Sequence, residues 1–184
     1  MAMRKLKHHE QKLLKKVDFL WQREQNVREI KILRRYHIQD REDYVRYNKI
    51  AGHITKLVAR LRKLDSADPY RAKMTDQLLD KLYDMGFITT KKSLAVCEHM
   101  TVSAMCRRRL PIMMVRMKLS ETVREAVTFI EQGHVKVGPT TITDPAFMVT
   151  RSFEDYVTWA NQSKIKKAVA KYNDKFDDYD LMNA

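Results

Sequence analysis

The chain has 184 residues, which is enough for one domain with a hydrophobic core, and its 44% hydrophobic content excludes a chain that is disordered throughout. Lysine and arginine number 36 against 23 aspartates and glutamates, and the net charge of +13 favours a polyanionic partner. No apolar run is long enough to span a membrane, so we expect a soluble, intracellular protein with no membrane partner. RNA or DNA is therefore the first candidate for the polyanionic partner.

The charge is distributed unevenly along the chain. Residues 1–64 carry 18 lysines and arginines against 7 acids, whereas residues 174–184 carry four aspartates and one lysine. We therefore predict four parts: a basic N-terminal arm (1–25), a helical region (26–105), a C-terminal unit (106–172) and an acidic tail (173–184).

The first stretch with helical spacing runs from Leu6 to Trp21. Its apolar face is narrow, formed by Leu13, Val17 and Leu20 with lysines and histidines around them. Such a segment is typical of an arm that orders on a partner.

The clearest predicted helix covers residues 40–64. Acidic residues occupy its first turn, where the helix dipole favours them. One face repeats apolar residues at intervals of three and four, and a basic stripe lies about 200° away from it. The apolar face comprises Tyr44, Tyr47, Ala51, Ile54, Val58 and Leu61, and the basic stripe comprises Arg46, Lys49, His53, Lys56, Arg60 and Lys63. A solvated face and a phosphate-binding face both fit this stripe.

The chain has only four glycines and four prolines, and several of them mark the ends of the remaining predicted helices. Asp68-Pro69 predicts a turn, a leucine-rich helix follows and ends at Gly86, and a further short helix is expected near Ser93. The first hundred residues are therefore predicted to form a helical layer.

The pattern changes after Cys106. Two short helices are predicted, the first with Pro111 in its first turn and the second capped by Ser120 and ended by Gly133. Three short strands are expected within residues 134–137, 146–149 and 156–159. Strands this short need a covering layer, so the fold class is α+β, mostly helical, with two helices packed on a small antiparallel sheet.

A basic surface is predicted on this C-terminal unit. Arg107, Arg108 and Arg109 precede the first short helix, and Lys118 lies beside the loop into the second helix, whose N-terminus favours anions. Lys136 and Arg151 can join them from the strands. RNA held by shape and phosphate contacts fits this surface better than DNA read by its bases.

The same residues carry a family resemblance. The run Arg108-Arg109-Leu110, followed by "LSETVREAVTFIEQGHVKVG" and "DPAFMV", resembles the S4-type RNA-binding module named for a small-subunit ribosomal protein. The segments "REDYVRYNKIAGHITKLVARLRKL" and "LLDKLYDMGF" resemble eukaryotic members of this family. The start "RKLKHHEQKLLKKVDFL" and the end "DYVTWANQSKIKKAVAKYNDKFDDYD" are most similar to S4-domain proteins of the U3 small nucleolar ribonucleoprotein. An extra Met-Ala before "MRKLKHHEQ" is the one small departure.

The resemblance implies assembly work in the small-subunit processome of the nucleolus, in the nucleus. It implies binding to U3 small nucleolar RNA and pre-rRNA, help with their pairing, and binding to the acidic scaffold M-phase phosphoprotein ten and other processome proteins. The RNA contacts that it implies are Arg107, Arg108, Arg109, Arg116, Lys118, Ser120, Lys136 and Arg151, then Arg4, Lys5, Lys7, His8 and His9 in the arm. Further candidate phosphate contacts are Arg46, Lys49, Lys56, Arg60, Lys63, Lys164, Lys166 and Lys167.

Other classes of protein fit the sequence less well. Neither His8-His9 nor Cys97, His99 and Cys106 has the spacing of a zinc site, so no metal or cofactor is expected. No Gly-rich phosphate loop, zinc-protease motif or nucleophile elbow occurs, so we expect no enzyme, although S4-type modules also serve RNA-modifying enzymes. A protein-only adaptor and a structural ribosomal protein of the S4 family remain as alternatives; the acidic end "DDYDLMNA" argues against the latter.

Overall fold

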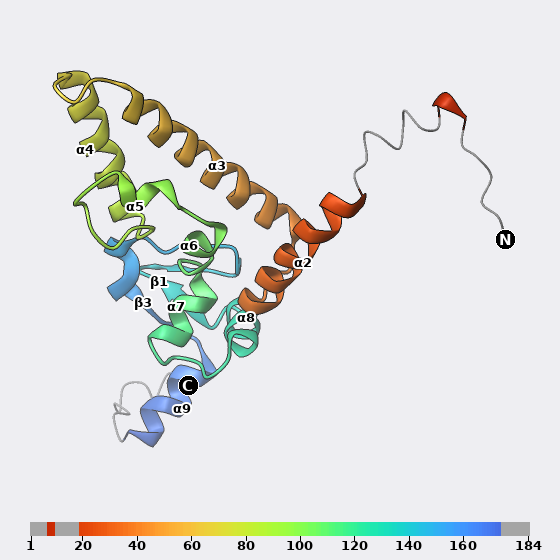
Figure 1. The fold of residues 1–184 in the computed structure, drawn as a ribbon. Helices are drawn as coiled ribbons and strands as arrows, with labels where there is room; N and C mark the ends of the chain where they lie inside the picture. The colour runs from red at the N-terminus through yellow and green to blue at the C-terminus, as the bar shows by residue number, and fades with distance from the viewer. Residues whose placement is uncertain (1–6, 10–18, 174–184) are drawn as a thin grey trace.

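The computed structural model describes residues 7–9 and 19–173, and Figure 1 shows how the elements are arranged. The N-terminal part is helical, and the C-terminal part combines helices with a small sheet. In the first part lie α2 (Phe19–Tyr36), α3 (Arg41–Lys63), α4 (Pro69–Asp84), α5 (Ala95–Glu98) and α6 (Val102–Cys106). In the second lie α7 (Leu110–Arg116), α8 (Val123–Glu131), β1 (Val135–Val137), β2 (Thr140–Thr141), the 3-10 helix η1 (Arg151–Tyr156), β3 (Val157–Trp159) and α9 (Lys164–Tyr172).

The long helix α3 confirms the prediction for residues 40–64. Asp40 is its N-cap and has an extended backbone. Glu42 and Asp43 lie in the first turn, where the positive end of the helix dipole stabilises their negative charges. Its inner face buries Tyr47, Ala51, Val58 and Leu61, four of the six predicted apolar positions. The helix ends at Lys63, with Leu64 as its C-cap, just before the turn to α4.

Local signals also set the ends of α4. The Asp68 carboxylate accepts a hydrogen bond from the backbone N–H of Tyr70 at 2.9 Å, and Pro69 needs no donor at the helix start. Gly86 closes the helix with φ of +75°, a conformation in which a side chain is strained. The short helix expected near Ser93 is α5, which starts at Ala95.

Two hydrophobic cores hold the chain together. The first is formed by the helical layer and includes Tyr47, Val58 and Met105, and the second includes Leu110, Ile130 and Val135. The second core joins α7 and α8 to a three-stranded antiparallel sheet in the order β2-β1-β3. This arrangement confirms the predicted fold class.

Two local predictions for the C-terminal unit are wrong. Residues 146–149 form no strand, because their backbone pairs with the arginine run instead: Leu110 N–H donates to Phe147 O and Val149 N–H to Arg108 O, both at 2.8 Å. β1 pairs instead with β2, which the turn at Gly138-Pro139 brings straight back, and with β3 on its other side.

The N-cap of α8 is Thr122 rather than Ser120. Thr122 and Glu125 form a reciprocal capping box, with each side chain accepting from the other residue's backbone N–H. The Ser120 hydroxyl is instead buried, without a hydrogen-bond partner among the described residues.

Candidate nucleic-acid interface

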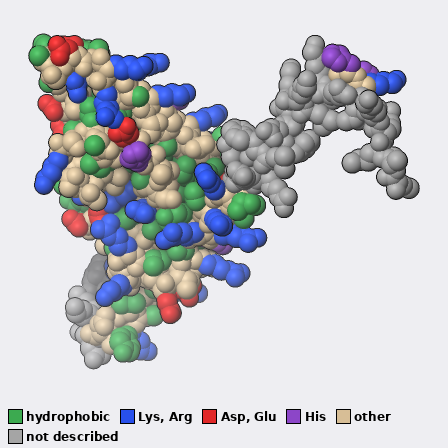
Figure 2. Space-filling view, in the orientation of Figure 1, with side chains coloured by type: hydrophobic (Ala, Val, Ile, Leu, Met, Phe, Trp, Pro, Cys, Tyr) green, Lys and Arg blue, Asp and Glu red, His purple; other side chains and the backbone are tan. Residues whose placement is uncertain are grey.

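The basic stripe of α3 is exposed along its whole length. Figure 2 shows Lys and Arg side chains standing out in a row along the edge formed by α3. Of the six stripe residues, only Arg46 forms an ion pair within the described part of the chain, with Glu42 at 3.5 Å and Asp43 at 3.8 Å. The other five, Lys49, His53, Lys56, Arg60 and Lys63, are exposed and present their side chains to solvent or to a polyanion.

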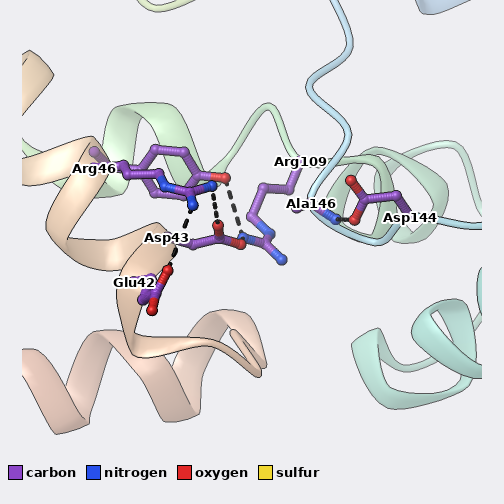
Figure 3. A network of polar contacts seen from close by, with 7 residues as sticks. Glu42, Asp43, Arg46, Arg109, Asp144 and Ala146 are labelled. Atoms are coloured by element: carbon purple, nitrogen blue, oxygen red, sulfur yellow. Dashed lines mark hydrogen bonds and ion pairs between the residues drawn. The ribbon is translucent and has the colours of Figure 1, made fainter.

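Arg109 is not on the surface. Its side chain enters the gap between the two cores, where Nη1 donates to the Asp43 carboxylate at 2.9 Å and to the Tyr47 hydroxyl at 3.1 Å (Figure 3). Only 2% of Arg109 is exposed. Burial raises the pKa of the Tyr47 phenol, an effect that the neighbouring guanidinium partly offsets. Arg109 thus ties the start of α7 to the start of α3.

Arg108 is buried as well, with 5% of the residue exposed. Nε donates to the Val149 carbonyl at 2.9 Å and Nη1 to Glu154 at 3.1 Å, while Nη2 has no partner within the described residues. A Cβ on Gly86 would come within 2.6 Å of Arg108 Nε, so the end of α4 needs glycine for space as well as for backbone conformation.

Arg151 lies against the end of α4. Its guanidinium donates to the Tyr83 carbonyl at 2.7 Å and the Ile88 carbonyl at 2.8 Å, and stacks 4.0 Å from the centre of the Tyr83 ring. Carbonyls near a helix C-terminus favour a cation, which explains why an arginine is held there.

Three predicted RNA contacts therefore connect the two cores. For Arg108 and Arg109 the structure argues against the predicted direct RNA contact, because their guanidinium groups are buried and bonded to protein. Arg151 is half-buried with its donors directed at carbonyls, so its first role is structural. Ser120 likewise turns its hydroxyl inward.

The remaining predicted cations of this region reach solvent. Arg107 and Lys118 are exposed and form no ion pair among the described residues, and Arg116 is 68% exposed although it lies 3.5 Å from Glu154. Arg124, in the first turn of α8, is exposed in the same way and was missed by sequence reasoning. Its position in the first turn of the predicted second helix was the available signal. The loop between α7 and α8 thus has exposed cations on both sides.

Lys118 has an unusual backbone. It lies in the left-handed region with φ of +60°, where it closes α7 through bonds from Lys118 N–H to Val115 O at 3.1 Å and from Leu119 N–H to Met114 O at 2.9 Å. The ends of α4 and α8 use the same arrangement with Gly86 and Gly133. A lysine at such a position is strained, because it carries a side chain where the other two helix ends carry glycine.

We expect stability and RNA binding to change in opposite directions in Lys118→Gly. Removing the strained side chain should stabilise the fold by about 0.5–1 kcal/mol, which is roughly 1–4 °C in Tm. Loss of one phosphate contact should weaken RNA binding roughly four- to fivefold at 150 mM salt. Thermal unfolding and RNA titration measure the two effects. Lys118→Ala, which keeps the strain and loses the charge, should show only the weaker binding; a glycine variant that binds like the parent chain excludes Lys118 as a contact.

The other predicted contacts are spread over the ends of the chain. Lys136 is half-buried in β1, while Lys164 and Lys166 are exposed in α9 and Lys167 is half-buried there. Lys7, His8 and His9 are exposed, and Arg4 and Lys5 lie outside the described residues. The predicted arm helix also lies mostly outside them.

The cysteines are buried in the first core. Both Cys97 and Cys106 are fully buried and free, and burial raises the pKa of the Cys106 thiol to about 11. A thiol of this kind is protonated at neutral pH and a poor metal ligand. Across residues 7–9 and 19–173, no group of three metal-binding side chains comes together and no helix is long and apolar enough to cross a membrane.

Family models divide the chain at the arginine run. A model described as the ribosomal protein S4/S9 N-terminal domain matches residues 5–107, and a model described as the S4 domain matches residues 108–154. Helices α7 and α8, strands β1 and β2, and the exposed cations Arg116, Lys118 and Arg124 lie in the second match, whereas β3 follows it. The class of protein defined here is that of S4-domain proteins.

Whole-chain relatives narrow the class. The chain is 57% identical over 181 residues to the U3 small nucleolar ribonucleoprotein protein IMP3 of Saccharomyces cerevisiae, covering 97% of this chain and 99% of the relative. It is 51% identical to the protein of the same name from Homo sapiens, with 97% and 98% covered. A small ribosomal subunit protein uS4 from Picrophilus torridus is 26% identical, with 78% and 79% covered. The chain belongs to the IMP3 family of U3 small nucleolar ribonucleoprotein proteins.

Proposed function

We propose that this chain is an RNA-binding assembly factor of the U3 small nucleolar ribonucleoprotein. It promotes pairing of U3 RNA with pre-ribosomal RNA during 18S rRNA processing and small-subunit biogenesis. The name of the relatives supports membership of the particle, and their coverage extends over nearly the whole chain. Those relatives are named as ribonucleoprotein proteins rather than as enzymes, which supports a non-enzymatic role.

One observation carries the proposal: the chain exposes two sets of cations without neutralising them. Four lysines and arginines of the α3 stripe lack ion pairs among the described residues, and so do Arg107, Lys118 and Arg124 around α7 and α8. Two RNA strands repel each other through their phosphates. A protein surface that contacts both strands lowers this repulsion and so favours their encounter.

Partners and location follow from membership of the particle. We propose U3 RNA and pre-rRNA as the nucleic-acid partners, and M-phase phosphoprotein ten with other small-subunit processome proteins as the protein partners. The net charge of +13 suits an acidic scaffold as well as RNA. The proposed location is the nucleolus, within the nucleus.

The alternative of a structural ribosomal protein has weaker support. The uS4 relative is 26% identical over 144 residues, against 57% over 181 residues for the yeast IMP3 relative. The lower similarity and shorter coverage favour the ribonucleoprotein family.

An annealing assay tests the proposal. The purified chain should accelerate pairing of a U3 RNA fragment with its pre-rRNA target, and rising salt should abolish the acceleration. Deleting residues 1–20 should leave the thermal unfolding temperature unchanged and slow annealing, because the basic arm adds contacts. A chain that binds both RNAs without changing their pairing rate contradicts the proposed activity, and equal rates with and without the arm exclude the arm from it.

A further inference from the structure

Asn161 brings together two lysines from different elements. Lys136 lies in β1 and Lys166 in the first half of α9, and the Nζ atom of each is 3.1 Å from the same oxygen, Asn161 Oδ1. The two ammonium groups are therefore at most twice that distance apart. Neither forms an ion pair with an aspartate or glutamate of residues 7–9 or 19–173.

The fold holds this pair in place. Val135 and Val137 point into the second core, so Lys136 stands on the open face of the sheet beside Thr141 of β2 and Thr158 of β3. The three paired strands fix one half of the cluster.

The start of α9 is fixed to the same sheet. Ser163, 2% exposed, caps the helix by accepting from the Ile165 N–H at 3.2 Å and lies 3.2 Å from His134 Nδ1. The Ala160 N–H also donates to the His134 carbonyl at 2.8 Å. Asn161 lies between Ala160 and Ser163, which hold this segment against His134. The backbone positions of Lys136 on the sheet and of Lys166 on α9 are therefore fixed before any ligand binds.

Two like charges around one neutral amide are incompletely compensated. The Asn161 oxygen accepts a hydrogen bond from each ammonium group but carries no charge to offset theirs. A phosphate group offers several charged oxygens, and its charge-assisted hydrogen bonds to ammonium groups are short and strong.

We propose that Asn161 positions Lys136 and Lys166 as one binding site for a backbone phosphate of RNA. This inference rests on the proposed RNA-binding function and extends it beyond the matched S4 domain, which ends at residue 154, into α9. RNA entering along the open face of the sheet contacts Lys136 and continues onto the basic side of α9. Asn161 itself is a positioning residue.

Substitutions at Asn161 separate positioning from structure. We expect Lys136→Gln and Lys166→Gln each to weaken binding of a U3 RNA transcript roughly four- to fivefold at 150 mM salt. The slope of log affinity against log salt should become shallower by roughly 0.7–0.9. Asn161→Asp keeps an acceptor for both lysines and adds a charge that competes with the phosphate. It should therefore lose more affinity than either lysine variant, with an unchanged or higher unfolding temperature.

The full chain is used throughout, with Lys73→Gln, exposed on α4, as the matched control for loss of one charge. If Asn161→Asp binds the transcript as the parent chain does, the amide serves only the fold and the inference is overturned. If Lys136→Gln and Lys166→Gln match the Lys73→Gln control, there is no phosphate site. In both cases the parent chain still binds RNA, whereas a parent chain that does not bind contradicts the proposed function itself.

Discussion

Replacing Arg109 with alanine is expected to destabilise the chain by about 3–5 kcal/mol, the usual result of removing one partner from a buried ion pair. Arg109 is 2% exposed, and its loss leaves the Asp43 carboxylate, itself mostly buried, and the Tyr47 hydroxyl without their shared donor. For a chain of this size, the unfolding temperature should fall by at least about 6 °C. Thermal unfolding and denaturant titration measure the change.

Arg107→Ala is the matched control, because the same residue type two positions earlier is exposed and has no ion pair among the described residues. Its effect on stability should stay within about 0.5 kcal/mol. A double-mutant cycle of Arg109→Ala with Asp43→Ala should give a coupling of about 0.5–3 kcal/mol. A folded Arg109→Ala protein with unchanged stability and weaker RNA binding would show that the arginine faces RNA rather than Asp43.

Sequence reasoning succeeded where the signal is local. The ends and the buried face of α3 follow from acids in the first turn and from apolar residues at intervals of three and four. Gly86 and Gly133 end their helices as expected, since the bonds that close a helix involve only neighbouring residues. The two-helix unit on a small sheet could be predicted from local signals too, namely the helical spacing before Gly133 and the short strand patterns within residues 134–137 and 156–159.

The roles of the three adjacent arginines could not be predicted in this way. Arg107, Arg108 and Arg109 have the same chemistry, yet one is exposed and two are buried. What separates them is distant in sequence: Asp43 is 66 residues before Arg109, and Glu154 is 46 residues after Arg108. A basic run shows that positive charge is needed, but only the packing of the two cores decides which charges compensate buried acids.

The mistaken strand has a similar cause. Residues 146–149 have the apolar character of a strand, but their backbone partners belong to the segment that starts α7. The two threonines of β2 are too few to show an alternating pattern. Pairing across the sheet depends on the turn at Gly138-Pro139, which places β2 beside β1 before the longer apolar segment is reached.

The largest expected effect on RNA binding concerns the basic stripe of α3, which the sequence left open between a solvated face and a phosphate-binding face. Replacing Lys49, Lys56 and Lys63 with glutamine should weaken binding of a U3 RNA transcript roughly 50- to 150-fold at 150 mM salt if each lysine contacts one phosphate. The slope of log affinity against log salt should fall by roughly 2–3. All three side chains are exposed, so the unfolding temperature should hardly change.

A second triple variant separates contact from net charge. Replacing Lys73, Lys81 and Lys92 with glutamine removes the same charge from exposed positions on α4 and just after it. If the lysines act through long-range attraction, which depends on total charge, RNA binding should weaken equally in both variants. If the lysines of the stripe contact RNA directly, binding should weaken much more in the variant of the stripe. Equal losses in the two variants would assign the stripe of α3 to solvent, and RNA binding would then rest on the cations around α7, α8 and α9.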